Sequence, residues 1–162
     1  MGTGVYLRFQ LDAALFAFPL DDVQEILPLP RLAKPPQLPP AIEGLLDLSG
    51  ETLAVLRLGL LLGLETSTLG LYAHLLRMRN CEPGLALLVD RATGVAPAAA
   101  SKWRNAPSEE SFRGCVVGQL VDGDETAHVL SFEHLLSEHE RRKIEAFLAA
   151  ERQRRLAFEE PP

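Results

Sequence analysis

Aromatic side chains and positive charge are both scarce in this chain. Phenylalanine, tyrosine and tryptophan make up 6% of 162 residues, and 22 acidic residues against 16 lysines and arginines leave a net charge of −6. Proteins that bind single-stranded nucleic acid stack bases on aromatic rings, and nucleic-acid binding in general draws affinity from clustered lysine and arginine. The composition therefore argues against nucleic acid as a partner.

Cysteine is also rare. Cys81 and Cys115 lie in separate expected strands and lack C-x-x-C spacing, which argues against both a disulfide framework and a thiolate metal site. The 4 histidines show neither H-x-x-x-H nor H-E-x-x-H spacing. We expect reduced, largely buried thiols and no metal or other cofactor.

Long apolar runs are missing. The most apolar stretch, residues 58–64, is far shorter than the ~20 residues that cross a bilayer. The N-terminus passes directly into an alternating pattern, without the basic and apolar regions of a signal peptide. We expect a cytoplasmic protein with no membrane insertion.

Catalytic motifs are missing as well. The sequence has no G-x-S-x-G nucleophile motif, and its glycine-rich stretch "GLLLGLETSTLG" has no lysine after the glycines, as a phosphate-binding loop would require. The basic triplets near the C-terminus stand among a similar number of glutamates, which is typical of the solvated side of a helix. We therefore expect no enzyme activity.

The apolar residues that are present alternate in short runs. Residues 5–11 and 16–20 each alternate with a period of two, which predicts two strands joined as a hairpin. Asp21 or Asp22 then predicts the cap of a short helix through "DVQEIL". The proline-rich stretch 28–40 favours a loop between strands, with a polyproline ligand as the alternative.

Further strands are expected in the middle and the second half of the chain. Residues 42–48 and 52–58 predict a hairpin with apolar residues on both faces, and a short helix follows it. Strands separated by turn signals at 80–84, 90–94 and 122–125 then predict small antiparallel barrels. Residues 100–112 predict a loop or helical turn with Trp103 as a core plug, and residues from 132 onward predict a C-terminal helix.

Four segments in a fixed order point to a known family. They are "FPLDDVQEIL", "IEGLLDLSGETLAVLRLGLLLGL", "GLALLVDRATGVA" and "FRGCVVGQLVDGDETAHVLSFEHLL". In this order and spacing the chain resembles the CheW family of chemotaxis adaptors over residues 5–137. The resemblance implies an all-β fold of two small five-stranded SH3-like β-barrels side by side, with short helices. We expect residues 1–137 to form this domain and residues 138–162 to form a C-terminal helical tail.

The resemblance also implies where partners bind. The family pattern contains a "VQE" segment, two turn glycines and a "VD" pair, and each of these has a counterpart in this sequence. Each counterpart could instead serve only the fold, as a solvated residue or as part of a turn. The candidate partner-binding residues are Val23, Gln24, Glu25, Ile26, Gly44, Ser49, Gly50, Ala54, Arg57, Asp90 and Gly94.

Three of these residues depart from the family pattern. Ser49 stands where the family has an arginine that supports receptor engagement, Ala54 where it favours proline, and Arg57 where it favours aspartate. Serine cannot reproduce the five donors of a guanidinium, and a reversed charge changes which partner surface is acceptable. The departures indicate altered partner choice, and drift at exposed positions is the alternative.

The sequence therefore predicts a non-catalytic chemosensory scaffold in signal transduction. The resemblance implies binding to the regulatory domain of a CheA-type histidine kinase and, in a receptor array, to the cytoplasmic tip of a chemoreceptor. One alternative is a divergent CheW-like interaction module outside a receptor array. The other is a small β-barrel that binds a ligand. Ile144, Phe147 and Leu148 either pack back on a barrel or contact a partner helix.

Overall fold

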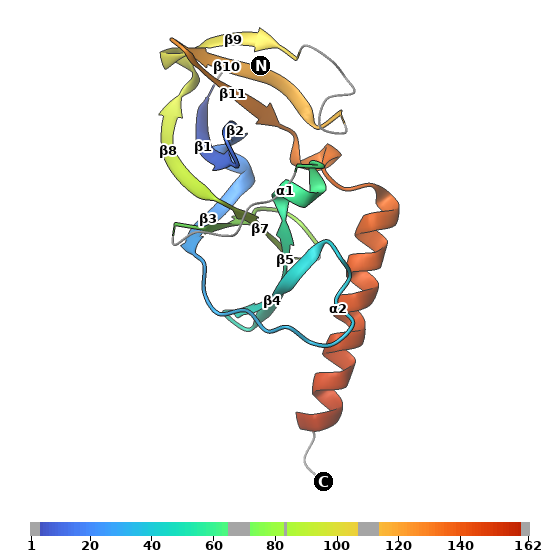
Figure 1. The fold of residues 1–162 in the computed structure, drawn as a ribbon. Coiled ribbons are helices and arrows are strands. Elements are labelled where there is room, and N and C mark those ends of the chain that lie inside the picture. Colours follow the sequence, from blue (N-terminus) through green and yellow to red (C-terminus); the bar gives the residue numbers. More distant parts are fainter. Residues whose placement is uncertain (1–3, 65–71, 83, 107–113, 160–162) are drawn as a thin grey trace.

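The computed structural model describes residues 4–64, 72–82, 84–106 and 114–159, and these residues form two sheets and a C-terminal helix (Figure 1). The first sheet has six strands in the order β8-β1-β2-β11-β10-β9. The strands are β1 (Val5–Leu11), β2 (Ala14–Pro19), β8 (Arg91–Pro97), β9 (Lys102–Asn105), β10 (Val116–Asp122) and β11 (Glu125–Leu130).

The second sheet has five strands among the described residues, in the order β3-β6-β7-β5-β4. They are β3 (Val23–Pro28), β4 (Ile42–Leu48), β5 (Glu51–Arg57), β6 (His74–Met78) and β7 (Leu85–Val89). The helices are α1 (Leu58–Leu61), α2 (Glu138–Glu159) and the short 3-10 turns Leu20–Asp22, Ala98–Ala100 and Phe132–His134.

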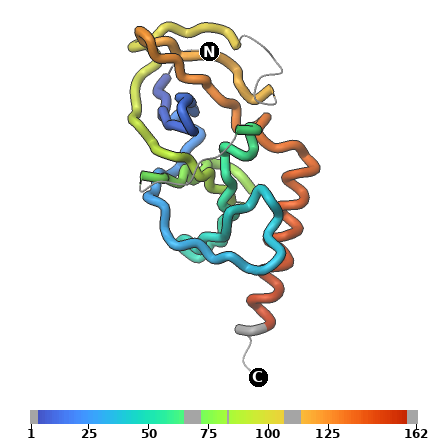
Figure 2. The backbone as a smooth tube through the Cα atoms, viewed as in Figure 1, coloured from blue at the N-terminus to red at the C-terminus, as the bar shows by residue number. Residues whose placement is uncertain are grey.

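The order of strands along the chain differs from their order in space. The chain leaves the first sheet after β2, builds the whole second sheet and returns to the first sheet at β8 (Figure 2). The N-terminal hairpin is therefore completed by C-terminal strands, with β2 parallel to β11. The expected architecture of two small barrels is confirmed. The first barrel combines strands from both ends of the chain, whereas the second barrel is built from the continuous stretch between them.

One barrel has an extra strand where a loop or helical turn was expected. Residues Lys102–Asn105 form β9, which pairs antiparallel with β10. Trp103 lies against the buried cluster on this sheet, as expected for a core plug. Gly118 on β10 makes room for it, because a Cβ there would lie 2.1 Å from the indole ring. Contact with Gly118 is a tertiary feature that local sequence does not reveal.

The prediction of a helix through "DVQEIL" is wrong. Leu20–Asp22 form only a 3-10 turn without a side-chain cap, and Val23–Pro28 form strand β3. The backbone of β3 pairs antiparallel with β6, which supplies hydrogen-bond partners that an isolated helix would have supplied internally. Tertiary pairing has overridden the local capping signal.

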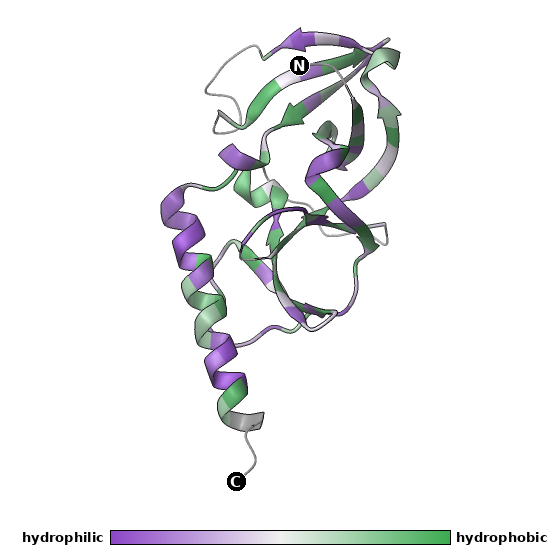
Figure 3. Ribbon diagram, turned by 180° about the vertical axis from the view of Figure 1, so that it is seen from behind, coloured by the Kyte–Doolittle hydropathy of each residue, from purple (hydrophilic) through white to green (hydrophobic). Residues whose placement is uncertain are grey.

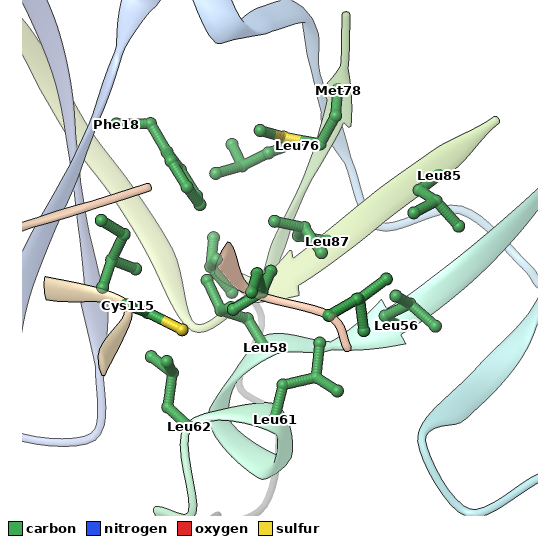
Figure 4. Close-up of a cluster of buried hydrophobic side chains, with 14 of the residues drawn as sticks. Phe18, Leu56, Leu58, Leu61, Leu62, Leu76, Met78, Leu85, Leu87 and Cys115 are labelled. Carbon is green, nitrogen blue, oxygen red and sulfur yellow. The ribbon is translucent and has the colours of Figure 1, made fainter. Parts of the chain in front are cut away.

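Buried apolar side chains form three clusters among the described residues. The largest cluster lies between the two sheets and includes Phe18, Leu56, Leu76 and Leu87, which point toward one another (Figure 4). Smaller clusters cover the far face of each sheet. Strand β5 is consequently buried on both faces, which accounts for the apolar character of both faces of its sequence.

Helix α2 packs back on the barrel of the second sheet. It runs along the outside of this barrel (Figure 3), where Ile144 and Leu148 are buried in the central cluster and Phe147 packs against it. Of the two alternatives for these side chains, the structure has the intramolecular one. Within the described ranges, no helix has the length and apolar character needed to span a membrane.

Candidate partner-binding site

Strand β3 forms one edge of the second sheet and contains four of the candidate residues. Val23 is buried, whereas Gln24, Glu25 and Ile26 are exposed, Ile26 by 38%. A register shift between Val23 and Glu25 opposite β6 marks a bulge at Gln24. Since no other described strand pairs with the second edge of β3, the strand presents open backbone groups beside exposed side chains.

An arginine connects this edge to the β4–β5 hairpin. The guanidinium of Arg77 on β6 donates a hydrogen bond of 2.8 Å to Glu51 and lies 4.0 Å from Glu25. The side chain of Arg77 is only 14% exposed, so the two carboxylates share a cation that is largely withdrawn from water. Arg77 was not among the predicted site residues, because its only signal in the sequence is a positive charge in a mostly apolar strand.

Ser49 and Gly50 form the two-residue turn of the β4–β5 hairpin. Both have positive φ, +53° and +80°, and the flanking residues Leu48 and Glu51 pair across the strands. Positive φ at both central positions is the type I′ geometry that matches the twist of the strands, and glycine suits it. Both residues are exposed at the tip, where the turn itself provides no charge.

Gly44, a candidate partner-binding residue, has a clear structural role in this fold. It is buried on β4, where an added Cβ would lie 2.8 Å from Cβ of Leu32 and 3.0 Å from the carbonyl oxygen of Ala33. Ala33 exchanges two backbone hydrogen bonds with Leu45, of 2.9 and 2.8 Å. The proline-rich connection thus covers the outer edge of β4, and Gly44 permits the close approach.

Two other hairpin residues also lie away from the tip. Ala54 is completely buried on β5 between its neighbours β4 and β7, so its side chain contacts the core and cannot reach a partner. Arg57 is 22% exposed and lies 3.9 Å from Glu43, which in turn lies 3.6 Å from Lys34. The reversed charge at Arg57 is therefore part of an internal cluster at the other end of β5.

Asp90 and Gly94 lie apart from these residues. Asp90 lies where the chain crosses from one sheet to the other, and Gly94 lies within β8. The carboxylate of Asp90 accepts a hydrogen bond of 2.6 Å from the backbone of Asp12 in the β1–β2 turn. Gly94 lies on β8 opposite Arg8, beside a register shift. Asp90 thus ties the first hairpin to the crossing point between the barrels, which is a folding role.

The C-terminal half of α2 contacts the hairpin through one polar cluster. Arg155 donates hydrogen bonds to Asp47 at 2.7 Å and to Thr52 at 3.4 Å, and Thr52 donates one to Asp47 at 2.8 Å. The bond from Thr52 and then that from Arg155 lower the pKa of Asp47, which is ionised at neutral pH. No local pattern in the sequence predicts this contact, because more than 100 residues separate the partners.

A cleft of about 480 Å³ lies between this half of α2 and the tip of the hairpin. One wall is formed by the hairpin and the other by the helix. The hairpin wall consists of Asp47, Gly50, Glu51 and Thr52. The helix wall consists of Leu148, Glu151, Arg152, Arg155 and Leu156.

Acidic residues also gather near the start of β3. Asp21, Asp22 and Glu133 line a smaller cleft of about 280 Å³. Burial, followed by the charges of Asp21 and Glu133, raises the pKa of Asp22. Among the described residues, no group of three histidine, cysteine or acidic side chains is arranged to hold a metal ion. The structure therefore offers surfaces and clefts for a partner, and no assembled metal centre within the described ranges.

Comparison with known proteins agrees with this geometry. The family model of the CheW-like domain matches residues 5–140. The fold is similar to that of the scaffolding protein TtCheW from Thermoanaerobacter tengcongensis, with a TM-score of 0.72, 19% sequence identity, and coverage of 83% of this chain and 88% of that one. No curated protein matches the sequence significantly. The chain belongs to the family of proteins with a CheW-like domain.

Proposed function

We propose that this protein is a non-catalytic adaptor that binds the regulatory domain of a CheA-type histidine kinase through the open edge of strand β3. The chain has a CheW-like domain, and the similar protein TtCheW is described as a scaffolding protein. The proposal implies a cytoplasmic location, where a kinase of this type signals. In this proposal the chain catalyses no reaction and only positions its partners relative to one another.

The observation that supports this proposal best is the unpaired edge of β3. Exposed Ile26 provides apolar area next to backbone groups that no other described strand pairs. A second β-barrel domain can pack against such an edge and bury Ile26, while the charge of Glu25 restricts which surfaces are acceptable. The opposite edge of the same sheet is unsuitable because residues 32–33 already cover it.

A calorimetric titration tests the proposal. Wild-type protein is expected to bind the isolated CheA regulatory domain, and Ile26→Asp is expected to weaken binding by about tenfold, since a charge would replace an apolar contact. Val95→Asp is the matched control, because Val95 is 50% exposed on the edge strand β8 of the other sheet. Equal losses from both variants, or no association of the wild type at high micromolar concentration, would contradict the proposal.

A second candidate function is an adaptor that works outside a receptor array. It is favoured by the turn Ser49-Gly50, which has no guanidinium where the family pattern has an arginine. A chain that retains kinase binding but fails to associate with a chemoreceptor cytoplasmic fragment, in the same calorimetric assay, would have this second function. Binding of both partners would instead support the complete adaptor.

A further inference from the structure

The cleft between the β4–β5 turn and α2 has neutralised carboxylates. Each acidic side chain in its walls has a cation within 2.8 Å. The pairs are Asp47 with Arg155, Glu151 with Arg154, and Glu51 with Arg77. These paired carboxylates present little net negative charge to anything that enters the cleft.

One cation in the cleft has no such partner. Arg152 is exposed, and no hydrogen bond or ion pair joins it to another described residue. The turn opposite, Ser49-Gly50, has no charge of its own. The carboxylates of the cleft are thus neutralised by ion pairs, whereas the guanidinium of Arg152 can still bind an anion. This favours an occupant that carries an anionic group.

Apolar side chains flank this guanidinium. Leu148, Arg152 and Leu156 follow one another at intervals of four residues and consequently lie along one face of α2. Leu148 is buried, whereas Leu156 is 49% exposed. Gly50 opposite has no side chain to fill the cleft. The exposed area of Leu156 can thus be covered by an apolar side chain from outside.

We propose that this cleft docks a segment of a partner protein in which a carboxylate stands beside apolar side chains. The carboxylate pairs with Arg152, and the apolar side chains cover Leu156 and the hairpin wall at Gly50. The bond from Arg155 to Asp47 and Thr52 holds the two walls at the spacing that admits the segment. This inference goes beyond the proposed kinase contact at β3, because it concerns a second surface between the hairpin and α2 and names the chemistry of its partner.

Titration of the full chain with short peptides, followed by NMR, tests this inference. The probe is a peptide of leucine, glutamate and leucine between blocked terminal glycines. We expect saturable shifts at the amides of Gly50, Arg152 and Leu156. A peptide with lysine for glutamate, and one with serine for leucine, should each bind at least about threefold more weakly, since each removes one of the two contacts.

Two charge reversals on α2 make the test specific. Arg152→Glu should weaken binding of the glutamate peptide by about fivefold, as expected for one exposed charge pair that becomes repulsive. Lys143→Glu makes the same change at an exposed position of α2 outside the cleft and should leave binding unchanged. Equal effects of the two variants would overturn the inference, as would shifts of the same size with inorganic phosphate alone.

The kinase titration separates this inference from the proposed function. Peptide binding that depends on Arg152, in a chain that does not bind the kinase domain, supports the cleft and contradicts the kinase role. Kinase binding without any effect of the peptides on the three amides supports the kinase role and overturns the cleft. Arg152→Gln provides a milder variant if the charge reversal alters the helix.

Discussion

The two edge strands of the second sheet differ in whether another described part of the chain covers them. Strand β4 is covered by the proline-rich connection, whose Ala33 pairs with Leu45, whereas β3 has no described strand on its second side. An uncovered edge promotes association with other chains unless it is blocked or used. Within the described residues, the fold itself therefore covers only one of the two edges, and the other is the edge proposed to bind a partner.

The largest expected effect on stability comes from displacing the proline-rich connection from the edge of β4. Gly44→Val should lower the free energy of unfolding by about 3 kcal/mol, because even a Cβ would collide with Leu32 and with the backbone of Ala33. Chemical denaturation measures the loss, and hydrogen exchange at the amides of Ala33 and Leu45 should become faster. Leu32→Gly in the same chain removes the nearest contact and should restore part of the stability. Full stability with unchanged exchange would show that close approach at Gly44 is not needed.

A smaller loss of stability is expected when Arg77, which links β3 to the hairpin, is replaced. Arg77→Gln leaves Glu25 and Glu51 without their shared cation and should cost about 1 kcal/mol of unfolding free energy, since Arg77 is mostly buried. Arg142→Gln is the control, because its pair with Glu138 is 2.7 Å long but both side chains are more than 70% exposed. Denaturation should show a clearly smaller loss for the control, and equal losses would contradict a special role of Arg77.

The smallest effect concerns the pH dependence at the start of β3. The folded protein raises the pKa of Asp22 above its ordinary value of 3.8, through burial and neighbouring carboxylates, so the folded state holds this proton more tightly than the unfolded state. This contribution favours folding at low pH and is lost as pH rises from about 3.8 through the raised pKa. Asp22→Asn should therefore increase stability at neutral pH by at most about 0.5 kcal/mol, because the group is partly in water.

Denaturation midpoints measured between pH 3 and pH 7 check this expectation, relative to Asp124→Asn, a control at an exposed aspartate in the turn between β10 and β11. The difference between Asp22→Asn and the wild type should grow as pH rises through this range, on the order of 0.5 kcal/mol in total. A difference that shrinks with rising pH would reverse the sign and contradict the assignment.

Much of the fold could be predicted from the sequence because its signals are local. The alternation in residues 5–11 and the apolar arms around Ser49-Gly50 correspond to the observed strands β1, β4 and β5. The C-terminal helix was likewise expected from its composition. In contrast, β3 was predicted as a helix, because Asp21 and Asp22 resemble a cap and nothing local reveals that β6 will pair with this segment.

The candidate site was harder to predict because its members meet only in space. Family resemblance pointed to Gly44 and Ala54, and the fold buries both. It could not indicate Arg77, Arg152 or Arg155, since their contacts depend on how α2 and β6 lie against the hairpin. A charged residue in a sequence has no assigned partner until the chain is folded.

The sequence by itself determined the class of the molecule: short alternating strands, few aromatics, no catalytic motif and a resemblance to CheW over most of the chain. Only the tertiary structure decided which strands share a sheet, which edge is covered and where the helix lies. The physical reason is that strand formation depends on residues two apart, whereas strand pairing and ion pairs join residues that are up to about a hundred positions apart.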